Sequence, residues 1–446
     1  MSLFRALVIA VLITFARDGS AQNTKTAPNV LILLADDLGW NDVSFHSSRA
    51  PTPNIARLAK DGLELQRFYT YPVCSPARAA LLTGQMPRRF GIVDVIGPGQ
   101  AGLPKGIATL PSTFRAAGYQ TSLIGKWHLG NSNPAMQCGF DHFYGFTGAE
   151  IEYFKHTTIR GSVRTDWQRD GTTVNEEGYS TYLFADEVIR QIKSRDTKRP
   201  FFLQVSFNAP HIPFAAPEEL VAKHKADGLY AAVLEGLDIA IGRILAALDA
   251  QSLRENTIVL FYSDNGSPVR ISNSAPLSFG KDTLYEGGIH TPCVIRWPGH
   301  VPAGAVTQQP VSAHDWLPTL TAAAGITAKS DTKLDGTDQW PALQTGKLIP
   351  RTPFLIAAHD IALFEGDWKL IEFVSGERRL FNLRTDISET KDALTSQPDI
   401  ATRLIAKLAE LKRDLPADTA RRNPSAPGAG GSGPRKRPPG GTTNQN

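Results

Sequence analysis

Short, continuous runs of apolar residues alternate along this chain with segments of helical periodicity, and no other feature constrains the fold as strongly. The run at residues 29–35, NVLILLA, shows no polar alternation, which is typical of a strand buried on both faces of a parallel sheet. Similar runs lie at residues 121–124, 201–207, 257–262 and 293–297, with helical patterns between them at 53–60, 110–117, 181–193 and 228–250. We therefore expect an α/β fold in which helices sandwich a large, mainly parallel sheet.

The sequence changes character after about residue 335. Strand-like segments at 354–358, 368–374 and 379–382 precede a helical pattern at 400–412, which predicts a small α+β subdomain. From Pro416 onward the chain consists mostly of proline, glycine, serine and basic residues, a composition typical of disorder. We predict a main domain over residues 22–340, a C-terminal subdomain over 341–415 and a disordered basic tail over 416–446.

The net charge of +4 raises the question of nucleic-acid binding. The tail from Pro416 onward carries five basic residues and one acidic residue, so it accounts for the whole excess. A nucleic-acid-binding domain needs a basic face on its folded body. Because the body of this chain is close to neutral, we predict no nucleic-acid partner.

The N-terminus has the three parts of a secretory signal peptide. Arg5 provides the positive charge, residues 6–15 are apolar, and the small residues 19–21 end in Ala21, where we expect cleavage. About ten apolar residues are too few for a spanning helix, which needs about 20. We therefore predict export to the periplasm or the extracellular space, with residues 1–21 removed and no membrane span.

An exported protein with three cysteines has at least one that forms no intramolecular disulfide. These residues are Cys74, Cys138 and Cys293. Cys138 and Cys293 either pair with each other or remain as buried thiols, and their spacing does not decide between the two.

Polar side chains follow four of the predicted strands at the points where these strands end: Asp36, Asp37, Lys126, His128, His211, Asp264 and Asn265. Ligands of open α/β sheets bind at that edge. A single carboxylate there is equally well explained as a helix cap. The three carboxylates and the Asn265 amide together offer only oxygen ligands, which calcium prefers. The basic members, with Lys281 further along, would favour an anionic substrate rich in oxygen.

The segment YPVCSPARAALLTG, residues 71–84, predicts a cysteine placed directly before a helix. Pro76 suits a first helical turn, residues 77–82 are good helix formers, and Gly84 is a typical terminator. A helix N-terminus favours anions, and Arg78 lies one turn after Cys74 on the same face. From physical reasoning alone, a buried structural cysteine explains Cys74 as well.

The sequence Cys-Ser-Pro-Ala-Arg at 74–78, followed by Leu-Thr-Gly at 82–84, resembles the signature of the type I sulfatases. The resemblance extends to LLADDLGWND, GKWHLG, APHIP, SDNG and GKDTLYEGG, and thus over most of the chain. It implies an alkaline-phosphatase-like sulfatase fold and hydrolysis of sulfate esters. It also implies that a formylglycine-generating enzyme oxidises Cys74 to formylglycine, and that one calcium ion is held by a set of five residues: Asp36, Asp37, Cys74, Asp264 and Asn265.

In the chemistry that this resemblance implies, the hydrated aldehyde of residue 74 attacks sulfur. Arg78 positions the diol, while Lys126 and Lys281 neutralise the sulfate oxygens. His211 donates a proton to the departing alcohol. His128 removes a proton from the second hydroxyl, which expels sulfate and restores the aldehyde.

Three segments, DDLGWNDVSFH, GFDHFYGFTGAEIEYFKH and DWLPTL, look most similar to the arylsulfatase B branch, which implies a substrate such as N-acetylgalactosamine 4-sulfate in a glycosaminoglycan-like carbohydrate. Aryl sulfates would also serve as substrates. Glu150, Glu152, Tyr153 and His156 are candidates for lining the substrate cleft, although an exposed polar loop explains them equally well.

Two rival functions remain open from the sequence. The first is a phosphonate or phosphodiester hydrolase of the same superfamily, against which stands a ligand set sufficient for one metal only. The second is an inactive protein that binds sulfated glycans, against which stands the complete set of site residues.

Overall fold

The structure, a computed structural model, describes residues 27–47, 50–97, 99–130, 134–272, 274–327 and 333–416 of the 446. The predicted signal peptide and the predicted tail beyond residue 416 lie outside the described residues. Among the described residues, none of the helices combines the length and the apolar composition that crossing a membrane requires.

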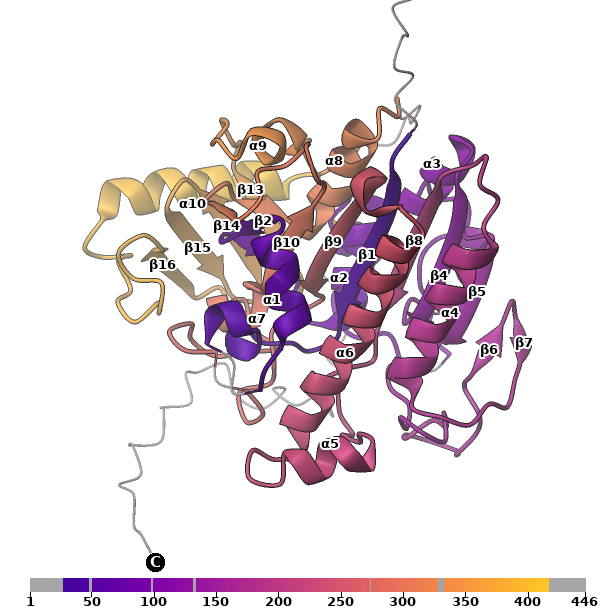
Figure 1. Ribbon diagram of the computed structural model, residues 1–446. Coiled ribbons are helices and arrows are strands. Elements are labelled where there is room, and N and C mark those ends of the chain that lie inside the picture. The colour runs from indigo at the N-terminus through magenta and orange to yellow at the C-terminus, as the bar shows by residue number, and fades with distance from the viewer. Residues whose placement is uncertain are drawn as a thin grey trace, which may run out of the picture.

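A ten-stranded sheet forms the centre of the molecule, with the strand order β11-β2-β10-β9-β1-β8-β4-β5-β6-β7 (Figure 1). Strand β1 pairs in parallel with β8 and β9, and β4 pairs in parallel with β8 and β5. In contrast, β10 runs antiparallel to both of its neighbours, β9 and β2. The strands of this sheet are β1 (Asn29–Ala35), β2 (Leu63–Leu65), β4 (Gln120–Lys126), β5 (His142–Phe146), β6 (Gln168–Arg169), β7 (Thr172–Thr173), β8 (Phe201–Ser206), β9 (Thr257–Ser263), β10 (Cys293–Arg296) and β11 (Ala305–Thr307).

Helices cover both faces of this sheet because successive side chains of its central strands point in opposite directions. Leu31, Leu33 and Ala35 of β1 pack with α1, α4 and α6, and Figure 1 shows α4 and α6 crossing in front of the sheet. Val30, Ile32 and Leu34 instead pack with α2, α3 and α8. The helices are α1 (Pro53–Lys60), α2 (Cys74–Thr83), α3 (Leu110–Ala116), α4 (Ser180–Ser194), α5 (Glu218–Lys223), α6 (Leu229–Ala250), α7 (Glu286–Ile289), α8 (Trp316–Ala323), α9 (Trp340–Thr345) and α10 (Pro398–Lys412). The predicted α/β sandwich is thereby confirmed.

A second, antiparallel sheet, β13-β14-β15-β16, lies beside the large one and carries α10 (Figure 1). One of its faces packs on α10 through residues such as Leu363 and Leu404, whereas Phe364 and Ile371 on the other face join the core of the large sheet. This small C-terminal subdomain was predicted, and its opposite face is continuous with the main core. Its strands are β13 (Phe354–Ala357), β14 (Ile361–Glu365), β15 (Trp368–Glu372) and β16 (Arg378–Asn382), and a separate pair is β3 (Phe68–Tyr69) with β12 (Val311–Ser312).

Short 3-10 helices occur where loops turn sharply. They are η1 (Trp40–Asp42), η2 (Ser44–His46), η3 (Pro87–Phe90), η4 (Ala135–Cys138), η5 (Arg254–Asn256) and η6 (Ala313–Asp315). Cys138 and Cys293 are both buried and do not form a disulfide, which answers the question that their spacing left open.

Candidate active site

Four neighbouring strands, β9, β1, β8 and β4, deliver polar side chains to one edge of the large sheet. Asp36 and Asp37 directly follow β1, and Asp264 directly follows β9. Lys126 is the last residue of β4, and His211 lies in the loop after β8. Because these strands are mutually parallel, their carboxyl ends meet, and the predicted site residues come together there.

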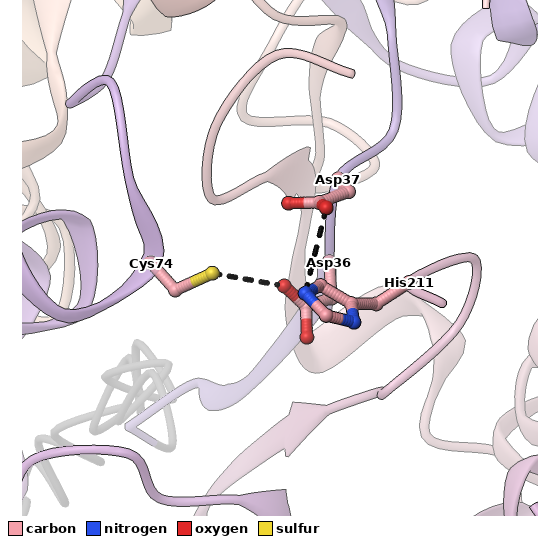
Figure 2. A group of neighbouring side chains, drawn as sticks. All are labelled: Asp36, Asp37, Cys74 and His211. Atoms are coloured by element: carbon pink, nitrogen blue, oxygen red, sulfur yellow. Dashed lines mark hydrogen bonds and ion pairs between the residues drawn. The ribbon is translucent and has the colours of Figure 1, made fainter. Parts of the chain in front are cut away.

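Cys74 is the first residue of α2, so the helix starts one residue earlier than the sequence suggested. Gly84 ends the helix as predicted, with a left-handed φ of 64° that suits glycine. The Cys74 thiol points toward the first strand end and donates to Asp36 Oδ1 at 3.3 Å (Figure 2). Residue 74 therefore lies between a helix N-terminus and the carboxylate cluster.

Three buried carboxylates face three cationic side chains in this site. Lys126 Nζ lies 2.6 Å from Asp36 Oδ2. Lys281 Nζ lies 2.6 and 2.8 Å from the two oxygens of Asp37. In the third pair, the Arg78 guanidinium donates to Asp264 Oδ2 from Nε at 3.1 Å and from Nη2 at 2.7 Å. Charge is balanced within the protein, so an added cation would leave the site positive and attractive to an anion.

Proton affinities differ sharply between two of these carboxylates. Burial alone would raise the pKa of Asp36, but the positive charges of Lys126 and His211 hold it well below its usual range. In the case of Asp264, burial, reinforced by the negative charge of Asp36, raises the pKa to about 6. Of these two carboxylates, Asp264 binds a proton more readily, so a further cation would do more to keep it ionised.

The unmodified thiol of Cys74 is poorly suited to nucleophilic attack. Burial, and next the negative charge of Asp36, raise its pKa well above the usual value. Because the thiolate is the reactive form of cysteine, a protonated thiol in this position is a weak nucleophile.

Two histidines face the site in different states. Nδ1 of His211 donates to the Ile212 carbonyl at 2.6 Å, since a carbonyl only accepts, and Nε2 lies 3.5 Å from Asp37 Oδ2. His128 is 2% exposed, and neither ring nitrogen has a hydrogen-bond partner within the described part of the chain. Burial, together with the charges of Lys126 and Arg78, lowers its pKa well below the usual value. A neutral, unengaged imidazole is able to accept a proton.

Oxygen donors at this edge fit a hard cation. The Asn265 amide donates from Nδ2 to Asp37 Oδ1 at 2.6 Å, while its buried Oδ1 has no hydrogen-bond partner among the described residues. An unpaired, buried acceptor beside carboxylates is costly unless a cation or another donor meets it. Asp36, Asp37, Cys74 and His211 also place one ligand atom each within 4.8 Å of one another (Figure 2). Since hard cations prefer oxygen, the carboxylates and Asn265 could hold such an ion.

Two of the four residues expected to line a substrate cleft are part of the core. Tyr153 is 1% exposed and donates to the carbonyls of Asn208 and His211, at 3.2 and 2.9 Å. His156 is equally buried and stacks on Trp167. That prediction is therefore wrong for these two residues, of which Tyr153 supports the loop that carries His211.

The remaining two cleft candidates lie nearer the surface. The Glu150 carboxylate pairs with Arg160 at 2.6 Å, and Glu152 lies 3.9 Å from Lys155. The Glu152 side chain is 43% exposed, which agrees with the exposed polar loop that was the alternative explanation, whereas the Glu150 side chain is only 8% exposed.

Ser75 is a site residue to which the sequence assigned no role. Its hydroxyl donates to the His128 carbonyl at 2.9 Å and accepts from the Ile96 amide at 3.0 Å. The start of α2 is thereby tied to the loop that carries His128. Ser75 stands inside the motif, but nothing in a linear sequence indicates which carbonyl its hydroxyl reaches.

Comparison with known proteins assigns this geometry to a family. The family model described as Sulfatase matches residues 28–326. The human N-acetylgalactosamine-6-sulfatase is 33% identical over 365 residues, which cover 75% of this chain and 69% of that protein. Mouse arylsulfatase J is 32% identical over 345 residues, covering 74% of this chain and 58% of that protein.

Solved structures show the same relationship. The crystal structure of Ps i-CgsB in complex with k-i-k-neocarrahexaose superposes with a TM-score of 0.82 and 31% identity, covering 88% of this chain and 94% of that one. The PsFucS1 sulfatase from Pseudoalteromonas sp. gives a TM-score of 0.75 and 26% identity, with coverage of 88% and 91%. With its fold, its strand-end site and these relatives, this chain belongs to the sulfatase family and is a sulfuric ester hydrolase.

Proposed function

We propose that this sulfatase removes sulfate from sulfated carbohydrates, using residue 74 as the nucleophile after its oxidation to formylglycine. One observation carries the proposal: the Cys74 side chain lies at the N-terminus of α2, 3.3 Å from Asp36 and 3.6 Å from Lys281 Nζ. A hydroxyl in the place of Sγ would lie near the Lys281 ammonium and at a helix N-terminus, both of which stabilise an anion. The thiol itself offers no comparable reactivity.

A calcium ion would be held by Asp36, Asp37, Asp264 and Asn265, whose oxygens include the unpaired Oδ1 of Asn265. When bound, such an ion acts as a Lewis acid that polarises oxygen and helps a hydroxyl to lose its proton.

The chain's own cations orient the reacting groups. In the hydrated aldehyde, one hydroxyl oxygen of residue 74 forms a bond to sulfur while the bond from sulfur to the alcohol oxygen breaks. Lys126 and Lys281, which both reach the carboxylates beside residue 74, would bind the sulfate oxygens. Arg78 donates to both Asp264 and the Lys126 carbonyl, and it thereby links the ends of β9 and β4.

Proton transfers fall to the two histidines. His211, anchored through Nδ1, presents Nε2 toward the site; in its doubly protonated form it would donate the Nε2 proton to the departing alcohol oxygen. His128, with two unengaged nitrogens, would take the proton of the second hydroxyl. The carbon–oxygen bond to sulfate then breaks as the aldehyde re-forms, so no water needs to attack sulfur.

The sugar and the sulfated position belong to this proposal as well. The resemblance to the arylsulfatase B branch favours a 4-sulfate, whereas mammalian relatives are named for the 6-sulfate of N-acetylgalactosamine. Another relative was crystallised with neocarrahexaose. Their common feature is a sulfated sugar of a polysaccharide, and that substrate class is the one we propose.

The export of the protein and the division of its chain into two domains remain predictions that accompany this function. A formylglycine-generating enzyme is the partner that maturation requires, and export would bring the enzyme to extracellular polysaccharides. The boundaries at residues 340 and 415 are proposed as the limits of the catalytic domain and of the C-terminal subdomain.

The decisive test is release of inorganic sulfate from a substrate panel by protein produced together with a formylglycine-generating enzyme. The panel contains an aryl sulfate, the 4- and 6-sulfates of N-acetylgalactosamine, sulfated carrageenan oligosaccharides and an aryl phosphonate monoester. We expect sulfate release that Cys74→Ala abolishes and that the matched change of another buried cysteine, Cys293→Ala, preserves. Faster hydrolysis of the phosphonate would favour the rival hydrolase, and glycan binding without turnover would favour the inactive binder.

A further inference from the structure

A buried ion cluster lies behind the loop that carries Lys281. Lys369 Nζ, from β15 of the C-terminal subdomain, lies 2.8 Å from both Glu286 Oε1 and Glu389 Oε1. His290 Nδ1 lies 2.8 Å from the other oxygen of Glu286. Glu286 and Lys369 are 0% exposed, His290 is 3% and Glu389 is 6%. None of these residues belongs to the proposed sulfate site.

The cluster binds the backbone as well as the side chain of Glu286. Glu389 Oε2 accepts a hydrogen bond from the Glu286 amide at 2.6 Å. Nearby, Ser278 Oγ donates to the Ser388 carbonyl. Both ends of the segment 278–286, which contains Lys281, are therefore held by the loop that follows β16.

This segment is packed too tightly to move in parts. A Cβ atom on Gly287 would lie 2.3 Å from the Phe279 carbonyl oxygen, and one on Gly288 would lie 2.1 Å from that of Thr283. The Lys281 amide donates to the Ser267 carbonyl at 3.1 Å, close to the strand end at Asp264. A shift of Glu286 would therefore be transmitted to Lys281.

Stability alone gives little reason for such a cluster. Buried ion pairs contribute weakly to folding because desolvation offsets their attraction, and apolar replacements are often as stable. Burial raises the pKa of Glu389 to about 7, with Lys369 shared between Glu389 and Glu286. What a fully connected cluster does provide is a single, well-defined position for the groups attached to it.

We propose that Lys369 and Glu389 of the C-terminal subdomain are positioning residues for Lys281 and act on it through Glu286. The inference rests on the proposed function, in which Lys281 binds sulfate oxygens. It makes the C-terminal subdomain part of the catalytic apparatus, although Lys369 and Glu389 contact Glu286 and not residue 74. Misplacement of a catalytic group by about 1 Å can lower the rate about 100-fold.

A double-mutant cycle separates positioning from general damage. Lys369→Met is made in the mature enzyme and in the Lys281→Ala variant, and kcat and KM for an aryl sulfate are measured in each. We expect Lys369→Met to lower kcat/KM about 10- to 100-fold in the enzyme that retains Lys281, and less than about twofold when Lys281 is absent. An equal loss in both backgrounds, or no loss in either, would overturn the proposal.

The matched control is Glu372→Gln, three residues along the same strand and therefore on its opposite face. Glu372 pairs with Arg378 at 2.8 Å, so this change also weakens an ion pair of β15, and it should leave kcat/KM unchanged. If Lys369→Met fails to fold, Glu389→Ala enters the same cycle, because it removes the acceptor of the Glu286 amide and leaves Lys369 paired with Glu286. An unsubstituted enzyme without turnover would refute the proposed function itself.

Discussion

Replacing Arg78 by methionine should destabilise the calcium-free protein more than any surface change of the same kind. The guanidinium is 2% exposed. It donates twice to Asp264 Oδ2, at 3.1 and 2.7 Å, and once to the Lys126 carbonyl at 3.1 Å. Methionine keeps much of the volume but offers no donor, so the substitution leaves a buried carboxylate and a buried carbonyl with lost partners.

The expected magnitude follows from the state of the Asp264 carboxyl. Breaking a buried ion pair by removing one partner costs about 3–5 kcal/mol. Asp264 can escape part of this penalty by binding a proton, because burial and Asp36 already raise its pKa to about 6 and each pKa unit corresponds to about 1.4 kcal/mol. We therefore expect a loss of about 3 kcal/mol at neutral pH, near the lower end of that range.

Equilibrium unfolding in urea measures this loss, provided that the transition is two-state and reversible. Arg57→Met is the matched control, since the Arg57 side chain is 58% exposed and lies 3.3 Å from Asp249. Exposed pairs of this kind contribute about 0–1 kcal/mol. A loss for Arg78→Met no larger than that for Arg57→Met would refute the reasoning.

Three further outcomes are expected. His211→Gln should slow sugar sulfates about 100- to 10,000-fold but activated aryl sulfates far less, because only poor leaving groups need a proton, and equal losses in steady-state assays would contradict its role as the acid. Calcium at a hundredfold excess over its dissociation constant should stabilise the fold by about 2.7 kcal/mol, seen as a rise in melting temperature that a chelator reverses; an unchanged melting temperature would speak against the ion. Glu389 has a pKa raised by burial from 4.5 to about 7, so its contribution favours the folded state below pH 4.5 and is lost as the pH rises through about 7. Glu389→Gln should accordingly show a smaller fall in unfolding free energy between about pH 5 and about pH 8 than the unsubstituted protein, and an unchanged fall would count against the raised pKa.

Much of the site could be predicted because its residues lie where strands end. Asp36, Lys126 and Asp264 each stand at or directly after an apolar run, and parallel strands bring such positions together. His211 follows the predicted strand at 201–207, so the strand pattern indicated this residue as well. Lys281 lies on a loop that follows no predicted strand directly, and periodicity carried no information about it.

Other features depend on contacts that a linear pattern does not contain. Strand β10 is as apolar as the parallel strands of the sheet, yet it runs antiparallel to β9. Its direction could not be predicted, because the sequence pattern of a buried strand is the same in both directions. The three-residue strand β2 is too short to show a periodicity. Lys369 and Glu286 are 83 residues apart, so their ion pair becomes visible only once the C-terminal sheet packs against the main core.

Mass spectrometry of the peptide that contains Cys74 tests the central claim most directly. The peptide should come from active protein made in its natural host or beside a formylglycine-generating enzyme, with its turnover of an aryl sulfate measured in parallel. Conversion of the thiol to the aldehyde lowers the mass by about 18 Da, and we predict that this fraction tracks the specific activity across preparations. Full activity in a preparation whose Cys74 is entirely unmodified would contradict the formylglycine mechanism.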